Sequence, residues 1–352
     1  MSTEGPKPPI TNETPPSKAR AWLMEIRLGF LTASITPVLL GTAMAWALTG
    51  IILWDIFLLT FIAGICLHSG ANMANDYFDH TAGQTGSDDI NKEFISPFSG
   101  GSRTIQLGYL TPKEVITGAM VFFAIGGLIG VYLAFTRDIL ILFIGVIGAG
   151  SGFFYTAPPF RFVKRGIGEI FIGMNFGVLM VFGSYFVQTL TIELEPIIAS
   201  IPMAILISAV LFINGFPDYV ADRDSGKKTL VVRLGRERAA KFYVIMITAG
   251  YVSILVSVLM NLISIFSLYA FLTLPFAVIA SKKAMAHHDN RILMIPANVS
   301  TIMNHLLTGL FMTVGYIVHG LSPIGFLEFG VPVLAILVIV TIFFYRKVPK
   351  ME

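Results

Sequence analysis

Charged residues are scarce in this 352-residue sequence. Only 13% of its residues are Asp, Glu, Lys or Arg, whereas 55% are hydrophobic. A soluble domain carries about 25% charged residues, so this chain has too few to cover a surface in water. The composition excludes an ordinary soluble protein and predicts that most of the chain lies in lipid.

Cysteine is nearly absent. Cys66 is the only one and lies in an apolar run, so a disulfide framework is excluded and we expect a buried, inert thiol. Residues 1–20 lack an apolar core, which argues against a signal peptide. They are polar and rich in proline, the composition of a disordered tail. We expect a disordered tail over 1–20, a membrane domain over 21–320, and a further span with a basic tail over 321–352.

Long apolar runs dominate the rest of the chain. A membrane-spanning helix needs about 20 mostly apolar residues. Ten runs meet this requirement and predict an all-α, polytopic bundle with nine core spans and a tenth. They lie near 28–48, 51–75, 115–136, 139–158, 168–189, 196–217, 240–260, 262–281, 300–319 and 327–345.

The basic residues orient these spans. Cytoplasmic loops of membrane proteins carry an excess of Lys and Arg. If the amino terminus is inside, all 24 Lys and Arg residues except Arg137 fall on the inner side. This asymmetry predicts an integral, multi-pass protein of the cell membrane with both termini in the cytoplasm. The two long loops, near 76–114 and 218–240, lie on the same side, so we expect an active site there.

Two amide and carboxylate patterns mark the starts of these loops. Asn72, Asn75, Asp76 and Asp79 are spaced i, i+3, i+4 and i+7, which places them on one face of a continued helix. The second pattern has a spacing of four and consists of Asn214, Asp218 and Asp222. Acids at a membrane boundary are costly and indicate function.

Two facing walls of carboxylates require a cation between them, because like charges repel. Mg²⁺ prefers such oxygens and is commonly bound by a few carboxylates together with substrate phosphates. Basic residues in the same loops could hold the rest of a diphosphate, namely Arg103, Lys164, Arg223, Lys227, Lys228 and Arg233. Acids for a metal and bases for phosphate beside an apolar bundle predict a lipid diphosphate substrate.

At these motifs the sequence resembles the UbiA superfamily of membrane prenyltransferases, over about residues 27–320. Residues 72–79 are similar to its first aspartate-rich motif and residues 214–223 to its second. Residues 155–169 resemble the segment that carries a tyrosine and a lysine near the diphosphate. The resemblance implies helices around a central cavity that opens to the cytoplasmic face, and Mg²⁺-dependent transfer of a polyprenyl group from its diphosphate to an aromatic acceptor.

The resemblance also implies residue roles. The metal ligands would be Asp76, Asp79, Asp218 and Asp222. The diphosphate would contact Asn72, Asn75, Arg103, Lys164, Asn214, Arg223 and Lys227. The catalytic groups would be Tyr155, Lys164, Asp76 and Asp222. The expected partners are the polyprenyl diphosphate, the acceptor and the bilayer, with no nucleic acid and no obligate protein partner.

One branch of the superfamily is especially similar. Residues 27–41, 75–79 and 226–235 resemble the dihydroxynaphthoate polyprenyltransferases of menaquinone synthesis. Transfer to 4-hydroxybenzoate or to a glycerophosphate lipid precursor is the alternative within the superfamily. A transporter is the alternative outside it, although transporter polar groups lie at the midplane and those here lie at one rim.

The predicted topology can be tested by labelling single cysteines in a Cys66→Ala background. Lys92→Cys and Lys228→Cys should react with an impermeant thiol reagent only from the cytoplasmic side, and Glu193→Cys only from the opposite side. Labelling of positions 92 and 228 from opposite sides of the membrane would contradict a shared active site.

Overall fold

Helices form every regular element of the described residues. The structure is a computed structural model, and the residues that it describes are 15–81, 101–321 and 326–349. Its longer helices are α2 (Thr32–Thr49), α3 (Trp54–Thr81), α5 (Pro112–Thr136), α6 (Leu140–Phe153), α8 (Met180–Thr189), α9 (Leu194–Asp224), α11 (Arg236–Leu259), α12 (Leu274–His287), α13 (Ile295–Leu321) and α14 (Val331–Tyr345). The shorter ones are α1 (Lys18–Ile26), η1 (Leu28–Phe30), η2 (Phe162–Arg165), α7 (Gly168–Ile172), η3 (Gly173–Leu179), α10 (Leu230–Leu234), η4 (Ile265–Thr273) and η5 (Phe326–Gly330).

The predicted all-α membrane bundle is confirmed. Within the described residues, nine helical stretches are long and apolar enough to cross a membrane, and α6 is a shorter apolar helix. Together these stretches correspond one to one with the predicted runs. α3 and α9 extend beyond their apolar runs, so both acidic patterns remain helical. Most of the predicted tail, and the loop position Lys92, lie outside the described residues.

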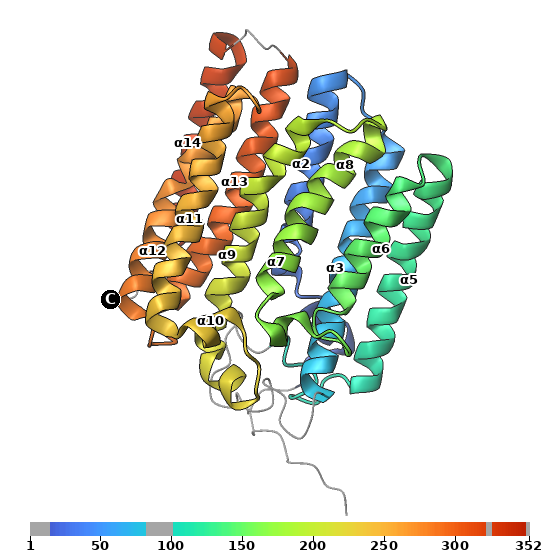
Figure 1. The fold of residues 1–352 in the computed structure, drawn as a ribbon, viewed down its shortest axis with the longest axis vertical. Helices are drawn as coiled ribbons and strands as arrows, with labels where there is room; N and C mark the ends of the chain where they lie inside the picture. Colours follow the sequence, from blue (N-terminus) through green and yellow to red (C-terminus); the bar gives the residue numbers. More distant parts are fainter. Residues whose placement is uncertain (1–14, 82–100, 322–325, 350–352) are drawn as a thin grey trace, which may run out of the picture.

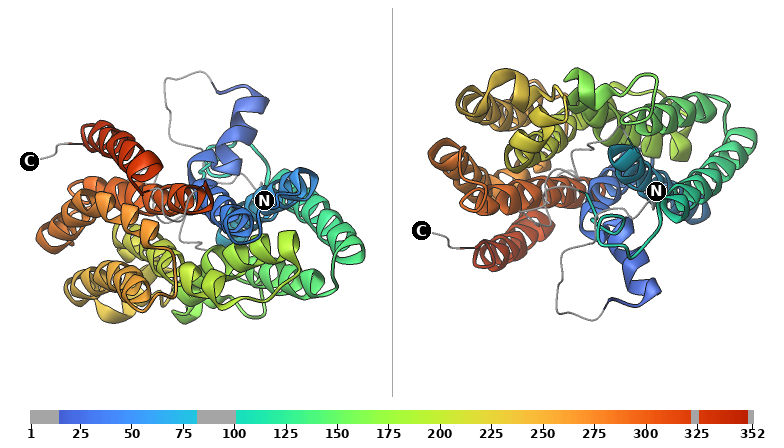
Figure 2. Two further views of the ribbon diagram at one scale, coloured as in Figure 1. Left: turned by 90° about the horizontal axis from the view of Figure 1, so that it is seen from above. Right: turned by 90° about the horizontal axis from the view of Figure 1, so that it is seen from below.

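The helices follow one another around a ring (Figures 1 and 2). α3 packs along α5, α5 contacts α6, and η3 packs on α9. The ring continues through α11, α12 and α13, which returns to α2. α14 lies outside this ring and contacts η4 and α13, as expected for the last span.

Two glycines allow the closest helix contacts. A Cβ atom on Gly41 of α2 would lie 2.3 Å from the carbonyl oxygen of Val181 in α8. A Cβ on Gly177, in the π-helical η3, would lie 2.3 Å from the Cα of Ala204 in α9. Small residues permit such approaches between membrane helices. These contacts hold α2, α8 and α9 together and leave a space on the side of α3, α5 and α6.

The ends of α3 and α9 bring both acidic patterns to the same end of the bundle. In Figure 1 the last turns of α3 lie at the lower end, together with α10 and the start of α5. The prediction that the two long loops share one end of the protein is therefore confirmed for the described residues.

Candidate active site

A cavity of about 570 Å³ lies between α2, α3, α5, α6, η3, α8 and α9. On α3 its lining extends from Thr60 to Asp79. A rise of about 1.5 Å per residue makes this roughly 28 Å. Most of the wall is apolar, but the end near the finish of α3 and α9 is polar. This arrangement suits a molecule with a charged head and a long apolar tail.

Lys227 joins the two acidic patterns at the polar end. Its ammonium nitrogen lies 2.6 Å from Oδ2 of Asp79 and 3.8 Å from Oδ1 of Asp222. All three side chains are buried. The amide of Asn75 also points at Asp79, with 3.4 Å between Nδ2 and Oδ2. Buried carboxylates need a compensating cation, and Lys227 supplies one to both helices.

A proline shapes the second pattern. Pro217 lies inside α9, and its missing N–H cannot bond to the carbonyl of Ile213. Asn298 of α13 instead donates its Nδ2 to that carbonyl, at 3.3 Å, and to Oδ1 of Asn214, at 2.7 Å. Asn298 thereby satisfies the freed carbonyl and fixes the side chain of Asn214 at the cavity wall.

Tyr155 follows α6 and lines the cavity between the two patterns. A Cβ atom on Gly168 would lie 2.9 Å from its ring, so glycine leaves the space that this ring occupies. Burial, reinforced by the carboxylate of Glu169, raises the pKa of Tyr155 above its ordinary value. The phenol therefore stays neutral and presents a polarisable ring and a hydroxyl to the cavity.

The profile of the UbiA prenyltransferase family matches residues 34–292. The chain belongs to the UbiA prenyltransferase family. The 1,4-dihydroxy-2-naphthoate octaprenyltransferase of Bacillus subtilis (strain 168) is 28% identical over 288 residues, which cover 82% of this chain and 89% of the relative. The enzyme of the same name from Escherichia coli (strain K12) is 29% identical over 313 residues, covering 85% and 96%.

Solved UbiA structures share the fold. A UbiA homologue from Aeropyrum pernix K1 superposes with a TM-score of 0.58 and 16% identity, covering 80% of this chain and 97% of that one. A homologue from Archaeoglobus fulgidus bound to DMAPP and Mg²⁺ gives a TM-score of 0.55 at 15% identity, covering 86% and 99%. Both support the helical ring of this UbiA family member.

The structure brings most of the predicted site residues to one cavity. Those that line it are Asn72, Asn75, Asp79, Tyr155, Asn214, Asp218, Asp222 and Lys227. Four others, Asp76, Arg103, Lys164 and Arg223, are not among its lining residues. Arg223 faces outward, where its Nε donates to Asp224 at 3.0 Å. Lys164 does not line the cavity; burial, followed by the charges of Arg161 and Lys227, lowers the pKa of Lys164.

Asp76 contacts Arg27, at the end of α1, and Ser102, in the segment that begins at residue 101. Its Oδ2 accepts from the N–H of Ser102 at 2.8 Å, and its Oδ1 lies 3.7 Å from Nη1 of Arg27. The hydroxyls of Ser102 and Thr104 both donate to Oε2 of Glu25. Burial, followed by the charge of Asp76, raises the pKa of Glu25 to about 7. Asp76 thus belongs to a polar cluster beside the cavity.

Sequence reasoning missed several residues at the site. Arg27 entered it as a basic residue of the inner side and as the first residue of the segment 27–41, without a role in the site. Glu25 and Asn298 did not enter it. The available signal was a polar residue in an apolar setting: Glu25 lies on a helix that otherwise reads as a surface segment, and Asn298 lies at the start of a span. Their importance depends on contacts with residues far away in the sequence.

The cavity mouth has the donors that Mg²⁺ prefers. Carboxylates of Asp79, Asp218 and Asp222 and the amide oxygens of Asn75 and Asn214 line it. Within the described residues, no three acidic, histidine or cysteine side chains are close enough to hold a metal ion by themselves. Mg²⁺ commonly takes one or two carboxylates and completes its shell with water and substrate phosphates, so the donor set fits an ion that binds with a diphosphate.

Replacing Lys227 with an uncharged residue tests whether its ammonium compensates the charges of Asp79 and Asp222. Lys227→Met leaves Asp79 and Asp222 buried without their cation, which costs about 3–5 kcal/mol when one partner of a buried pair is lost. We expect a lower Tm in detergent with chelator present, and a larger rise in Tm on adding Mg²⁺ than in the unmodified protein. The exposed Lys228→Met is the control. An unchanged Tm for Lys227→Met would contradict this charge balance.

Proposed function

We propose that this protein transfers a polyprenyl group from an allylic polyprenyl diphosphate to 1,4-dihydroxy-2-naphthoate, with Mg²⁺ and with release of CO₂. The observation that carries the proposal is the pairing of two amide and carboxylate patterns with Lys227 at the mouth of a long apolar cavity. A diphosphate suits the mouth, and a polyprenyl chain suits the apolar wall. The names of the two bacterial relatives support the acceptor.

In this proposal the diphosphate lies between α3 and α9. Asp79 would hold Mg²⁺ from one side, Asp218 and Asp222 from the other, with Asn75 and Asn214 as further contacts to the metal or to phosphate oxygens. Bound there, Mg²⁺ would neutralise charge on the diphosphate and favour cleavage of the C–O bond. Since Asp76 does not line the cavity, it is not proposed as a ligand.

Lys227 would hold the departing pyrophosphate in this proposal. With Mg²⁺ compensating Asp79 and Asp222, the ammonium of Lys227 would be free to donate to phosphate oxygens. Lys164, with a pKa lowered by burial and neighbouring positive charge, would add positive potential behind it. Both groups stabilise charge that develops on the leaving group, which is the interaction that accelerates the step.

The apolar wall protects the allylic cation from water. The neutral ring of Tyr155 at the cavity wall can face the cation through its π electrons. The ring of Phe176, which lies 4.5 Å from the ring of His68 between centroids, lines the cavity deeper in. A cation formed in this space meets the aromatic acceptor before it meets water.

The acceptor step requires no general base, because CO₂ leaves the attacked carbon in place of a proton. The C–O bond of the donor breaks, and its electron pair leaves with the diphosphate. The ring carbon that bears the carboxylate forms the new C–C bond, assisted by the ortho hydroxyl. The C–CO₂ bond then breaks, its electron pair restores the aromatic ring, and CO₂ leaves. With an ionised carboxylate, no proton has to be removed from the attacked carbon.

We also propose that the cavity mouth faces the cytoplasm. The support is the placement of basic residues on the inner side in the sequence, and the position of both acidic patterns at one end of the bundle. Polyprenyl diphosphates and aromatic acids would then reach the mouth from the aqueous side, while the tail passes into the apolar part of the cavity.

The metal proposal is tested by chelation and by carboxylate variants. Prenyl transfer should stop with excess chelator and return with added Mg²⁺. Asp79→Asn, Asp218→Asn and Asp222→Asn should each lower kcat/KM by about 10²-fold or more, because each removes charge stabilisation from the transition state. Asp224→Asn, an exposed residue of the same helix end, is the control. Full activity in chelator, or near-normal rates in two of the three variants, would contradict the proposal.

The acceptor proposal is tested with carboxyl-labelled substrate. Purified protein given a polyprenyl diphosphate and ¹⁴C-carboxyl 1,4-dihydroxy-2-naphthoate should release labelled CO₂ in a one-to-one ratio with the prenylated product. Prenylation of 4-hydroxybenzoate with its carboxylate retained, and no turnover of the naphthoate, would assign the other acceptor. Mass spectrometry of the products distinguishes the two outcomes.

A further inference from the structure

Arg27 is a cationic side chain of the cavity wall that the donor chemistry does not use. It lies at the end of α1, and its side chain is 18% exposed. It lines the cavity together with Phe30, Asn72 and His68. Among the described residues its guanidinium makes one ion pair, with Asp76, at a distance longer than a hydrogen bond. Its planar fork of N–H donors is therefore available to a planar anion.

The backbone holds Arg27 in place despite a local cost. Its φ of 58° lies in the left-handed region, which a residue with a side chain adopts only at an energetic cost. Its N–H bonds to the carbonyl of Met24 at 3.0 Å, and its carbonyl accepts from Phe30 at 2.8 Å. Strain that the surrounding structure maintains is common at binding sites. This turn directs the guanidinium over the ring of Phe30, 5.0 Å from its centroid.

A polar cluster fixes the other side of the guanidinium. Glu25 is fully buried and accepts from the hydroxyls of Ser102 and Thr104. Ser102 in turn donates its N–H to Asp76, the ion-pair partner of Arg27. Asp76 is 3% exposed and is not among the residues that line the cavity, so it contacts Arg27 and does not contact the cavity contents directly. Asp76 and Glu25 thus act as positioning residues for Arg27.

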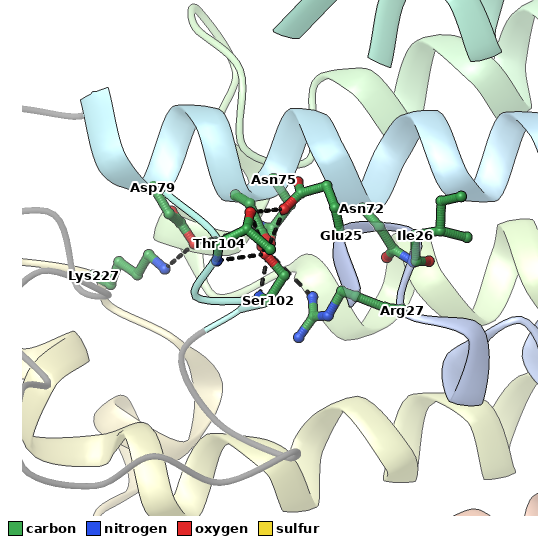
Figure 3. Close-up of polar contacts among 10 residues, drawn as sticks. Glu25, Ile26, Arg27, Asn72, Asn75, Asp79, Ser102, Thr104 and Lys227 are labelled. Atoms are coloured by element: carbon green, nitrogen blue, oxygen red, sulfur yellow. Dashed lines mark hydrogen bonds and ion pairs between the residues drawn. The ribbon is translucent and has the colours of Figure 1, made fainter. Parts of the chain in front are cut away.

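The donor diphosphate and Arg27 belong to different places along α3. Figure 3 shows Lys227 beside Asp79 at one end of the drawn segment and Arg27 near Asn72 at the other. Seven residues of helix separate Asn72 from Asp79, which corresponds to about 10 Å along the axis. A diphosphate held at Asp79 and Lys227 leaves Arg27 beyond the reacting carbon, on the side where an acceptor must lie.

From these observations we infer that Arg27 binds the carboxylate of the aromatic acceptor, with Phe30 beside the aromatic ring. This inference rests on the proposed function and names the residue that recognises the acceptor. A guanidinium holds a carboxylate through two parallel N–H bonds, which fixes both position and ring plane. The carboxyl-bearing carbon is then directed toward the donor. Arg103, which also lies in this region, is buried outside the cavity lining.

The test compares donor and acceptor kinetics in Arg27→Gln, Arg27→Lys and the exposed control Arg20→Gln. Loss of a charge-assisted bond is worth about 1.5–3 kcal/mol, so Arg27→Gln should raise the acceptor KM by about 10-fold or more. The donor KM should be unchanged. Arg27→Lys keeps the charge without the fork, so its acceptor KM should lie between those of the unmodified protein and of Arg27→Gln. Arg20→Gln should match the unmodified protein.

A carboxamide analogue of the acceptor gives a readout that misfolding cannot imitate. The unmodified protein should bind the naphthoate more tightly than 1,4-dihydroxy-2-naphthamide, measured by competition, and Arg27→Gln should lose this preference. Equal binding of acid and amide by the unmodified protein would overturn the inference. A raised donor KM with an unchanged acceptor KM would also overturn it, because that result would place Arg27 at the diphosphate. Arg27 variants that remain folded and keep the preference for the acid would overturn it as well, even where kcat or the folded fraction is lowered.

Failure of the proposed function is recognised separately. If the unmodified protein prenylates 4-hydroxybenzoate and not the naphthoate, the proposed acceptor is wrong. The same comparison is then made with 4-hydroxybenzoate and its amide, because that acceptor also carries a carboxylate. A lost preference for the acid in Arg27→Gln still supports Arg27, and a retained preference overturns it.

Discussion

The repulsion between carboxylates that meet in a poorly solvated cavity mouth is the constraint on which the site depends. Asp79 and Asp222 come from helices far apart in the sequence and lie on either side of one ammonium, that of Lys227. Without a cation between them, desolvation and like-charge repulsion would force protonation or separation. The site therefore contains the positive charge of Lys227, and in the proposed reaction an ion that arrives with the diphosphate would take over this role.

This constraint explains why the helices are longer than the membrane requires. α3 and α9 run past their apolar segments to Thr81 and Asp224, so the acids lie one or two turns outside the apolar wall. Pro217 loosens the last turns of α9, and Asn298 takes up the carbonyl that the proline leaves free. The second acidic pattern is consequently held by α13 as well as by its own helix.

The sequence predicts those features that depend on local composition and spacing. Apolar runs give the spans, because length and hydropathy alone decide whether a helix crosses lipid. The spacing of Asn75 and Asp79 predicts that they share a helix face, and the structure places both at the cavity. The spacing could not predict that Asp76, the residue after Asn75 on that helix, faces Ser102 and Arg27. That orientation depends on which helix packs on each side of α3, which spacing does not encode. The bridge from Lys227 to Asp79 spans 148 positions of sequence and is likewise set by tertiary packing.

In the proposed reaction, the positions of Lys227 and Arg27 separate the binding of the donor from the binding of the acceptor within one cavity. A polyprenyl diphosphate and an aromatic carboxylate are both anions, so a single diffuse patch of positive charge would bind either one at either place. Discrimination comes from geometry. At Asp79 and Lys227 the site combines acids with a base, which suits an anion only when a divalent metal accompanies it. At Arg27 the two nearby acids among the described residues, Asp76 and Glu25, do not line the cavity. Asp76 accepts from a backbone N–H and Glu25 from two hydroxyls, so in this proposal a carboxylate without a metal would be accepted there. In this proposal two anions of different chemistry would be directed to opposite ends of a short stretch of α3, with the reacting carbons between them.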